Sequence, residues 1–452
     1  MVRPIDRFTH YRALISLGVP IIIGQVGTIV LGFTDTLMVG HHSTVELAAA
    51  GFINSMFSLV MIFALGFSYS LTPIVGSMYG RGATGDIGKA LVSGLAANTE
   101  LAVILLCVTA AFYLNLHNFG QPEELLALMR PYLLVHIVSL PFLCWLNTFN
   151  QFYNTLGDSK VTMYVLLGGN LLNIVLNYVL IYGVFFFPEL GLFGAGVATL
   201  TSRVAMCLTF VAIFVLGGKY VVYRRGLSVR SLSVSLLRRY NSLGWPIAFQ
   251  IGMEVAAFSL TAIFVGWMGV VSLAAHQIML TVSQFFYMVY YGMAAAVSVR
   301  VSYFYGQGDY SSIRSTVKAG LRIILFTAVV VSTPMFLLRG VVGTWFTDSE
   351  EVCVLVSQTI IPLILYQFGD GLQCTYANAL RGLSHVRVML YSAFVSYVVI
   401  SLPLSWFLGV HMKFGLVGLW SAFPVCLTCA GVFYYVSYKK FVKSRESGGG
   451  TA

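Results

Sequence analysis

Charged residues are scarce in this sequence of 452 residues. Asp and Glu together number 16, and all charged residues make up 9% of the chain, whereas soluble proteins carry about 25%. So few charges cannot solvate the surface of a globular chain of this size, which excludes the soluble, disordered and coiled-coil classes. Hydrophobic residues make up 58%, and the mean hydropathy is +0.85. The composition therefore predicts an all-α polytopic membrane protein, because lipid cannot satisfy exposed backbone groups.

Motifs for disulfide, nucleotide or cofactor chemistry are also missing. The 7 cysteines are odd in number and lie in or beside apolar runs, which argues against a disulfide framework. The sequence around Lys89 is not a phosphate-binding loop, because Ala83 and Ala90 replace its first Gly and its Ser/Thr. We therefore expect no cofactor and no enzyme activity, and any pumping must be driven by an ion gradient. The net charge of +10 indicates membrane orientation, not nucleic-acid binding.

Apolar runs long enough to cross a bilayer, which takes about 20 residues, recur along the chain. Twelve are predicted, over 13–39, 45–76, 90–115, 128–155, 161–186, 191–217, 241–266, 271–302, 317–340, 353–381, 386–410 and 414–438. An even number of spans places both termini on one side of the membrane.

Basic residues are distributed unevenly between the two sides. Of the 26 Lys and Arg, 22 fall in the termini, the central linker and the loops on the same side, while three fall in the opposite loops. The positive-inside rule therefore predicts that both termini are cytoplasmic. The predicted parts are an N-lobe over 1–217, a basic linker over 218–240, a C-lobe over 241–440 and a flexible tail over 441–452.

The chain repeats itself at an offset of 226 residues, half its length. Leu17-Gly18-x-Pro20 recurs as Leu243-Gly244-x-Pro246, and Tyr79-Gly80-x-Gly82 recurs as Tyr305-Gly306-x-Gly308. Six spans per repeat is an even number, so the two halves enter the membrane the same way round. Such parallel repeats form two six-helix bundles, with substrate and ion sites near the repeat interface and alternating access by rocking of the lobes.

Four acids cannot be placed outside the apolar runs: Asp35, Glu100, Glu254 and Asp370. Each charged acid near the bilayer centre costs about 2.5–3.5 kcal/mol, so such residues are expected to be functional. Asp35, Glu254 and Asp370 each lack an acidic counterpart at the equivalent position of the other repeat. This asymmetry favours a functional role over scaffold symmetry. Carboxylates and amide oxygens suit Na⁺, and a buried carboxylate also suits a proton. We predict cation or proton binding at Asp35, Glu254 and Asp370, with helix pairing as the alternative.

Other polar residues in or near the spans are expected to have structural or interfacial positions. Arg203 is expected to be paired or to extend toward the interface, and Glu100 to reach the cytoplasmic interface. His276 is expected to be a polar interface residue, and His42 to be solvated in an outer loop with its neighbour His41.

The arrangement of these residues resembles the multidrug and toxic compound extrusion (MATE) family in its NorM-like branch, over about residues 10–440. The resemblance rests on the twelve spans and on Phe33-Thr34-Asp35-Thr36, Asn173-Ile174-x-x-Asn177, Glu254 and Tyr366-Gln367-x-x-Asp370. It implies a monomeric antiporter of the bacterial inner membrane. The expected cargo is lipophilic organic cations, such as dyes and fluoroquinolone-like drugs, exchanged for inward Na⁺ or H⁺.

The same resemblance implies particular site residues. A cation site of the C-lobe falls on Glu254, Asp370 and Tyr366, and a cation or proton site of the N-lobe falls on Asp35, Asn173, Asn177 and Thr199. A related branch carries an acid at the position of Asn177, which leaves the coupling ion open. The aromatic stretch from Phe285 to Tyr291 suits cations through cation–π contact. Candidates for the substrate cavity are Gln250, Gln284, Phe286 and Tyr290.

Two other functions share parts of this pattern. A lipid-linked sugar flippase of similar architecture would need several Arg or Lys in the spans to bind a pyrophosphate, and only Arg203 is clearly there. An intramembrane aspartyl protease would need two carboxylates about 3 Å apart, whereas Asp35 and Asp370 lie in opposite halves of the sequence.

Overall fold

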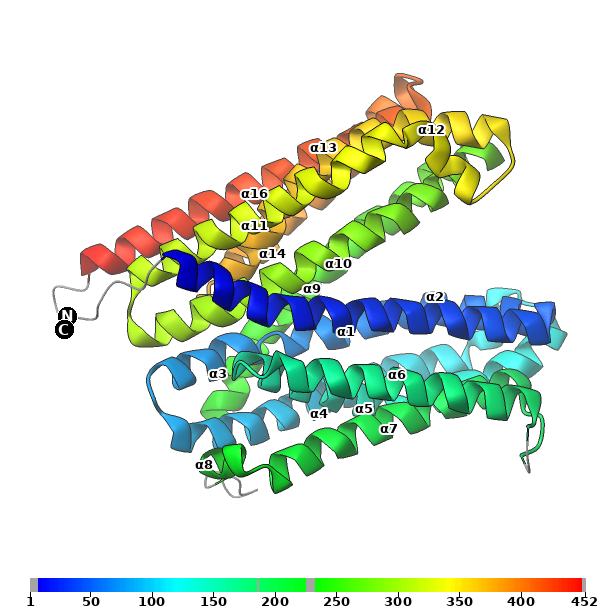
Figure 1. Cartoon of the computed structure of the whole chain (residues 1–452). Helices are drawn as coiled ribbons and strands as arrows, with labels where there is room; N and C mark the ends of the chain where they lie inside the picture. Colours follow the sequence, from blue (N-terminus) through cyan, green and yellow to red (C-terminus); the bar gives the residue numbers. More distant parts are fainter. Residues whose placement is uncertain (1–6, 185–186, 225–231, 449–452) are drawn as a thin grey trace. The chain divides into compact units, whose positions relative to one another are not determined.

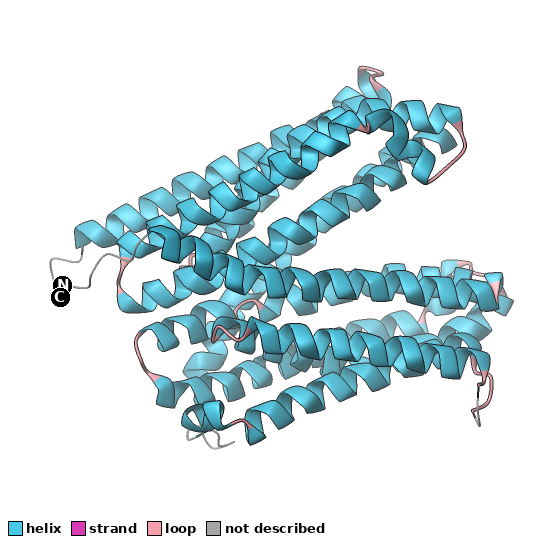
Figure 2. Cartoon of the chain, viewed as in Figure 1, coloured by secondary structure: helices cyan, strands magenta, loops and turns pink. Residues whose placement is uncertain are grey.

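The computed structural model describes residues 7–184, 187–224 and 232–448. Every regular element among them is a helix, and none of these residues forms a strand (Figures 1 and 2). The α-helices are α1 (Arg7–His42), α2 (Thr44–Ser68), α3 (Leu71–Gly80), α4 (Thr84–Leu114), α5 (Glu123–Thr155), α6 (Ser159–Tyr182), α7 (Gly191–Leu216), α8 (Val221–Arg224), α9 (Val234–Gly266), α10 (Val270–Gln307), α11 (Tyr310–Leu337), α12 (Arg339–Val342), α13 (Glu350–Gly382), α14 (Arg387–Ala393), α15 (Leu402–Trp406) and α16 (Gly415–Gly448).

Twelve spans are long and apolar enough to cross a membrane within the described ranges, which confirms the prediction from hydropathy. Two of them depart from a plain α-helix. The second span, Thr44–Gly80, is divided into α2 and α3 by a turn at Tyr69 and Ser70. The eleventh, Arg387–His411, contains two π-helical segments, η5 (Phe394–Ser401) and η6 (Phe407–His411), on either side of α15.

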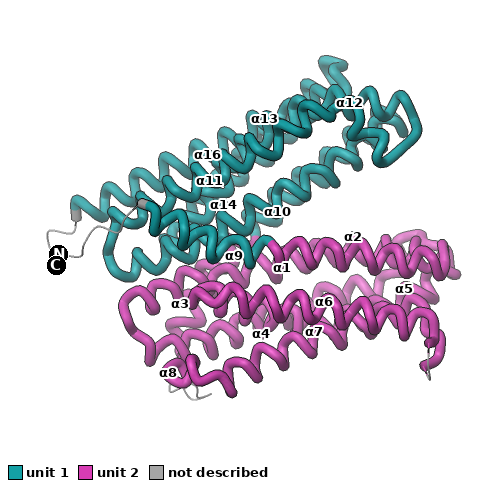
Figure 3. Tube along the Cα trace, viewed as in Figure 1, with its two compact units in different colours: residues 1–22, 249–452 teal, residues 23–248 magenta. Residues whose placement is uncertain are grey.

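The chain forms two compact units whose boundaries cut through two helices (Figure 3). Unit 1 contains residues 1–22 and 249–452, and unit 2 contains residues 23–248. The beginning of α1 therefore belongs with the second repeat, and the beginning of α9 with the first. The predicted lobes over 1–217 and 241–440 assign these two segments the other way. The two boundaries, after residues 22 and 248, are themselves one repeat apart.

Repeat-related glycines make this exchange of helix ends sterically feasible. A Cβ added at Gly18 would lie 2.5 Å from Met293 Sδ in unit 1, and one added at Gly244 would lie 2.6 Å from the Phe67 ring in unit 2. Gly18 and Gly244 are equivalent in the repeat, and so are Phe67 and Met293. The Leu-Gly-x-Pro motif therefore marks the two places where an exchanged helix end packs directly against a helix of the other repeat.

Each unit has its own apolar core. In unit 1 the core joins α9, α10, α13 and α16 around Trp420 and Phe423, and in unit 2 it joins α1, α2, α5 and α7 around Ile53 and Tyr132. The predicted linker and the predicted tail both contain helix within the described residues. α9 begins at Val234, and α16 extends to Gly448, while residues 225–231 and 449–452 lie outside the described ranges.

Candidate functional site

The predicted C-lobe residues come together in unit 1 from two helices. Glu254 lies on α9, and Asp370 and Tyr366 lie one turn apart on α13. The two carboxyl groups are close enough for their charges to interact. The structure thus places the predicted residues in one cluster, whereas their role in ion binding stays a prediction.

Asp370 is almost fully removed from solvent and has weak hydrogen-bond support. Its side chain is 1% exposed, and Oδ1 accepts from the Cys374 thiol at 3.4 Å. Its Oδ2 has no hydrogen-bond partner among the described residues. A thiol is a weak donor, so the protein alone solvates an ionised carboxylate poorly at this position.

Tyr366 forms the apolar wall beside Asp370. Its ring packs edge-on against Phe258 and Trp420, with centroid distances of 6.3 Å to each. Its hydroxyl reaches Ser283 on α10. This packing holds the tyrosine on the same face of α13 as the acid that follows one turn later.

Glu254 has better support than Asp370. Its Oε2 accepts from Gln250 Nε2 at 3.1 Å and from Gln373 Nε2 at 3.4 Å. The Gln373 amide also donates to the Tyr397 hydroxyl at 3.0 Å, and Tyr397 lies in the π-helical segment η5. π-Helical segments occur frequently at functional sites. Gln373 and Tyr397 are absent from the predicted site, although the i+3 spacing from Asp370 could have indicated Gln373.

Neither acid of this cluster has a permanent basic partner. Within the described part of the chain, no Lys, Arg or His nitrogen forms an ion pair with Glu254 or Asp370 within 4.0 Å. Arg381 interacts with Glu254 electrostatically, but its side chain donates to Asn378. A carboxylate pair in this setting can hold a cation, or it can share a proton.

The four predicted N-lobe residues also lie together, within unit 2. Asp35 on α1 accepts a short hydrogen bond from Asn177 on α6. Asn177 also donates to Asn173 at 2.9 Å, and Asn173 contacts the Thr199 hydroxyl of α7 at 3.3 Å. With its amide turned by half a rotation, Asn173 donates to Asp35 at 3.1 Å. Two amide groups therefore contact Asp35, and the Thr199 hydroxyl contacts Asn173 behind them.

The four candidates for the substrate cavity differ in their exposure. Gln250 is buried and bonded to Glu254, and Tyr290 is buried with its hydroxyl unpartnered among the described residues. Phe286 is partly buried against the core of unit 1, and Gln284 is exposed at its surface. Gln250 thus belongs structurally to the acid cluster.

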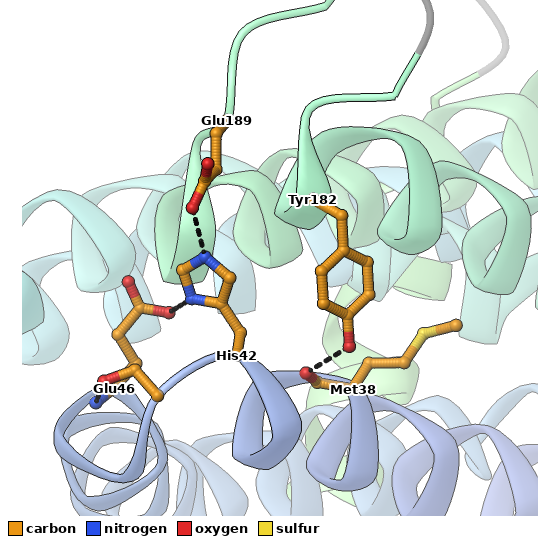
Figure 4. Close-up of polar contacts among 6 residues, drawn as sticks. Met38, His42, Glu46, Tyr182 and Glu189 are labelled. Atoms are coloured by element: carbon orange, nitrogen blue, oxygen red, sulfur yellow. Dashed lines mark hydrogen bonds and ion pairs between the residues drawn. The ribbon is translucent and has the colours of Figure 1, made fainter.

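Two histidines differ from expectation. His276 was expected at a polar interface, but its side chain is 1% exposed and Nδ1 accepts from the Trp420 indole at 3.1 Å. His42 was expected in solvent, but its ring joins two acids at 2.8 Å each, Glu46 of α2 and Glu189 before α7 (Figure 4). The partners lie on other segments, so hydropathy could not reveal either contact.

Glu100 lies outside the two acid clusters described above, and the cysteines form no disulfide. Glu100 is exposed on α4 and accepts from Asn241 at 2.9 Å. All seven cysteines are free thiols. Among the described residues, no three His, Cys, Asp or Glu side chains come together as they would around a transition metal.

Comparison with known proteins agrees with this arrangement. The MatE family model matches residues 20–179 and 246–407. The chain is 29% identical to the probable multidrug resistance protein NorM of Photorhabdus laumondii over 444 residues, covering 96% of this chain and 97% of that protein.

Solved structures share the fold. A MATE in complex with MaL6 has a TM-score of 0.88 at 19% identity, covering 97% of both chains. The eukaryotic MATE transporter AtDTX14 has a TM-score of 0.86 at 19% identity, covering 98% of this chain and 99% of that one. A MOP superfamily transporter from Pyrococcus furiosus, described as having a binding pocket of reverse polarity, has a TM-score of 0.86 at 20% identity, covering 97% of each.

The family model covers most of the chain, in two blocks that correspond to the two repeats. Together with the relation to NorM along nearly the whole length, this accounts for the duplicated six-span bundles and for the absence of enzyme motifs. The chain belongs to the MatE family, the multidrug and toxic compound extrusion transporters, and is a transporter of the NorM kind.

Proposed function

We propose that the protein is a secondary antiporter that exports lipophilic organic cations, including dyes and fluoroquinolone-like drugs, in exchange for inward Na⁺ or H⁺. The observation that carries the proposal is the cluster of Glu254 and Asp370, two acids in membrane spans with no ion-pair partner within the described residues. A carboxylate placed in a membrane span at this cost requires compensation by a cation. A coupling ion supplies that compensation when it binds and removes it when it leaves.

Coupling follows if the ion and the drug favour different orientations of the lobes, because only differential affinity moves a conformational equilibrium. The relation to a probable multidrug resistance protein supports drugs as the cargo. The excess of basic residues in the termini, the linker and the loops of one side supports an orientation with both termini in the cytoplasm. The relation to a bacterial NorM supports a bacterial inner membrane as the location.

The test is ethidium transport in everted membrane vesicles, with a Na⁺ gradient and a pH gradient imposed separately. We expect uptake into everted vesicles with one of the two gradients, and loss of uptake in Glu254→Gln. Glu100→Gln is the matched control, because Glu100 is exposed and its one side-chain hydrogen bond among the described residues comes from Asn241. Ethidium uptake that does not depend on either gradient would contradict the proposal. Uptake by Glu254→Gln at the wild-type rate would also contradict it.

A further inference from the structure

Arg203 is a buried cation in the middle of a membrane span. It lies twelve residues into α7, about 18 Å along the helix from Gly191 at 1.5 Å per residue. Its side chain is 8% exposed. Within the described residues it forms no ion pair within 4.0 Å. A charge at this depth is expensive, so the absence of an ion-pair partner within 4.0 Å among the described residues points to a functional role.

Most of the hydrogen-bonding capacity of Arg203 remains available for a ligand. A guanidinium has five N–H donors. The only hydrogen bond found for Arg203 within the described ranges goes from Nη1 to the Ser139 hydroxyl of α5, at 2.6 Å. The guanidinium carbon also lies 5.8 Å from the centre of the Phe57 ring of α2. A planar fork of this kind matches the two oxygens of a carboxylate.

A second polar group with no partner lies in the same cluster. The His136 ring packs between Phe57 and Tyr132, with centroid distances of 4.7 and 4.5 Å. Its side chain is 5% exposed, and neither ring nitrogen has a hydrogen-bond partner among the described residues. An unsatisfied buried polar group is unfavourable. A neutral imidazole always has one N–H to donate, so an acceptor in this cluster would remove the deficit.

The cluster reaches the surface of unit 2 through α2. The Tyr132 hydroxyl donates to Asn54 at 3.2 Å, and Asn54 is exposed. Ser55 and Ser58 on the same helix are exposed as well. Polar residues in a membrane span usually face protein or a water-filled cavity. The exposed polar side of α2 is therefore suited to admit a water-soluble molecule.

The nearby acid Asp35 forms no direct ion pair with Arg203 within 4.0 Å. Asp35 is close enough for electrostatic interaction with Arg203, but its carboxylate is held by Asn177 of α6. Asp35 is itself predicted to bind the coupling cation or a proton. Whenever that cation is bound, the positive charge of Arg203 is left without compensation in unit 2.

We propose that Arg203, held by Ser139, and His136, packed on Tyr132, form a binding site for the carboxylate of an exported organic molecule. The site then recognises the acid group of those fluoroquinolone-like drugs that carry a carboxylate as well as an amine. This inference rests on the proposed efflux function and deepens it by naming the residues that select for that acid group.

The test compares three compounds in proteoliposomes: a zwitterionic fluoroquinolone, its ethyl ester, which keeps the amine but loses the acid, and ethidium. Wild-type protein is expected to transport the acid with a kcat/KM about tenfold above that of the ester, since hydrogen bonds to charged groups are strong. In Arg203→Gln this ratio falls to about one, and Arg203→Lys gives an intermediate ratio because it keeps the charge but loses the planar fork. Arg130→Gln is the matched control, because Arg130 is exposed near the outer end of α5.

The possible outcomes distinguish failure of the carboxylate site from failure of the proposed efflux function. Absence of ethidium transport by the wild type would reject the proposed function. If the wild type transports ethidium but has the same kcat/KM for the acid and the ester, the carboxylate site alone is rejected. An acid-to-ester ratio of kcat/KM that is unchanged in Arg203→Gln would also reject it. If Arg203→Gln does not fold, thermal unfolding of the wild type with each compound provides the test. We expect the acid to raise the Tm more than the ester does at equal concentration, and equal shifts in Tm would overturn the inference.

Discussion

Replacing Asp370 with Asn should remove ion-dependent stability from unit 1 without unfolding the protein. An ionised acid in the middle of a span costs about 2.5–3.5 kcal/mol, and the protein offers Asp370 one thiol donor at 3.4 Å. A bound cation must therefore supply most of the compensation. Since Asn has nearly the same shape, we expect Asp370→Asn to fold and, in the absence of the ion, to be as stable as the wild type or more so.

The magnitude follows from binding linkage. A coupling ion at about 100 times its Kd stabilises a single-site protein by about 2.7 kcal/mol. Asp370→Asn should lose a gain of about this size at the site of unit 1, and the double variant with Asp35→Asn should lose the gain at the second site as well. The assay is thermal unfolding of purified protein over a Na⁺ series at constant ionic strength and over a pH series, together with ethidium efflux from cells.

The matched control is Asp86→Asn, the same change at the exposed first turn of α4. Asp86 is 56% exposed and pairs with Lys89 at 3.1 Å. An exposed pair of this kind contributes about 0–1 kcal/mol, so the control should keep both its ion dependence and its efflux. Wild-type ion dependence and wild-type efflux in Asp370→Asn would refute the reasoning.

Two further outcomes follow from the packing. Gly244→Ala should destabilise by about 1–3 kcal/mol, because the new Cβ would lie 2.6 Å from the Phe67 ring, whereas Gly51→Ala, with nothing within 4 Å, should stabilise its helix by about 0.5–1 kcal/mol. Chemical or thermal unfolding of the purified variants measures both, and equal stabilities would contradict the exchanged packing. Asn177→Leu should reduce ethidium efflux about tenfold, a loss of about 1.4 kcal/mol, because Asp35 loses its main donor. Asn170→Leu on the same helix, whose Nδ2 has no partner among the described residues, should retain efflux, and equal effects of the two would count against the N-lobe site.

Several features could be derived from the sequence because their causes are local or periodic. Hydropathy over about 20 residues predicts each span without knowledge of its neighbours, and all twelve are found. The repeat explains the equivalent glycines in the first turns of the sixth and twelfth spans. A Cβ at Gly194 would lie 2.7 Å from the Leu180 carbonyl oxygen, and one at Gly418 would lie 2.8 Å from that of Leu408. Acids in apolar runs could be identified because their insertion cost is a property of the residue and its depth.

Tertiary structure alone decided which residues meet. The exchange of the first parts of α1 and α9 between the units depends on packing between segments far apart in the sequence, such as His10 with Thr316 and Tyr240 with Ala90, which no local pattern encodes. The same holds for Gln373 beside Glu254, for His42 between two acids, and for Arg203 above the Phe57 ring. A polar residue in a span shows from sequence that some partner is required, because lipid offers none. Which partner it finds depends on how the helices pack, and that is set by side-chain fit over the whole bundle.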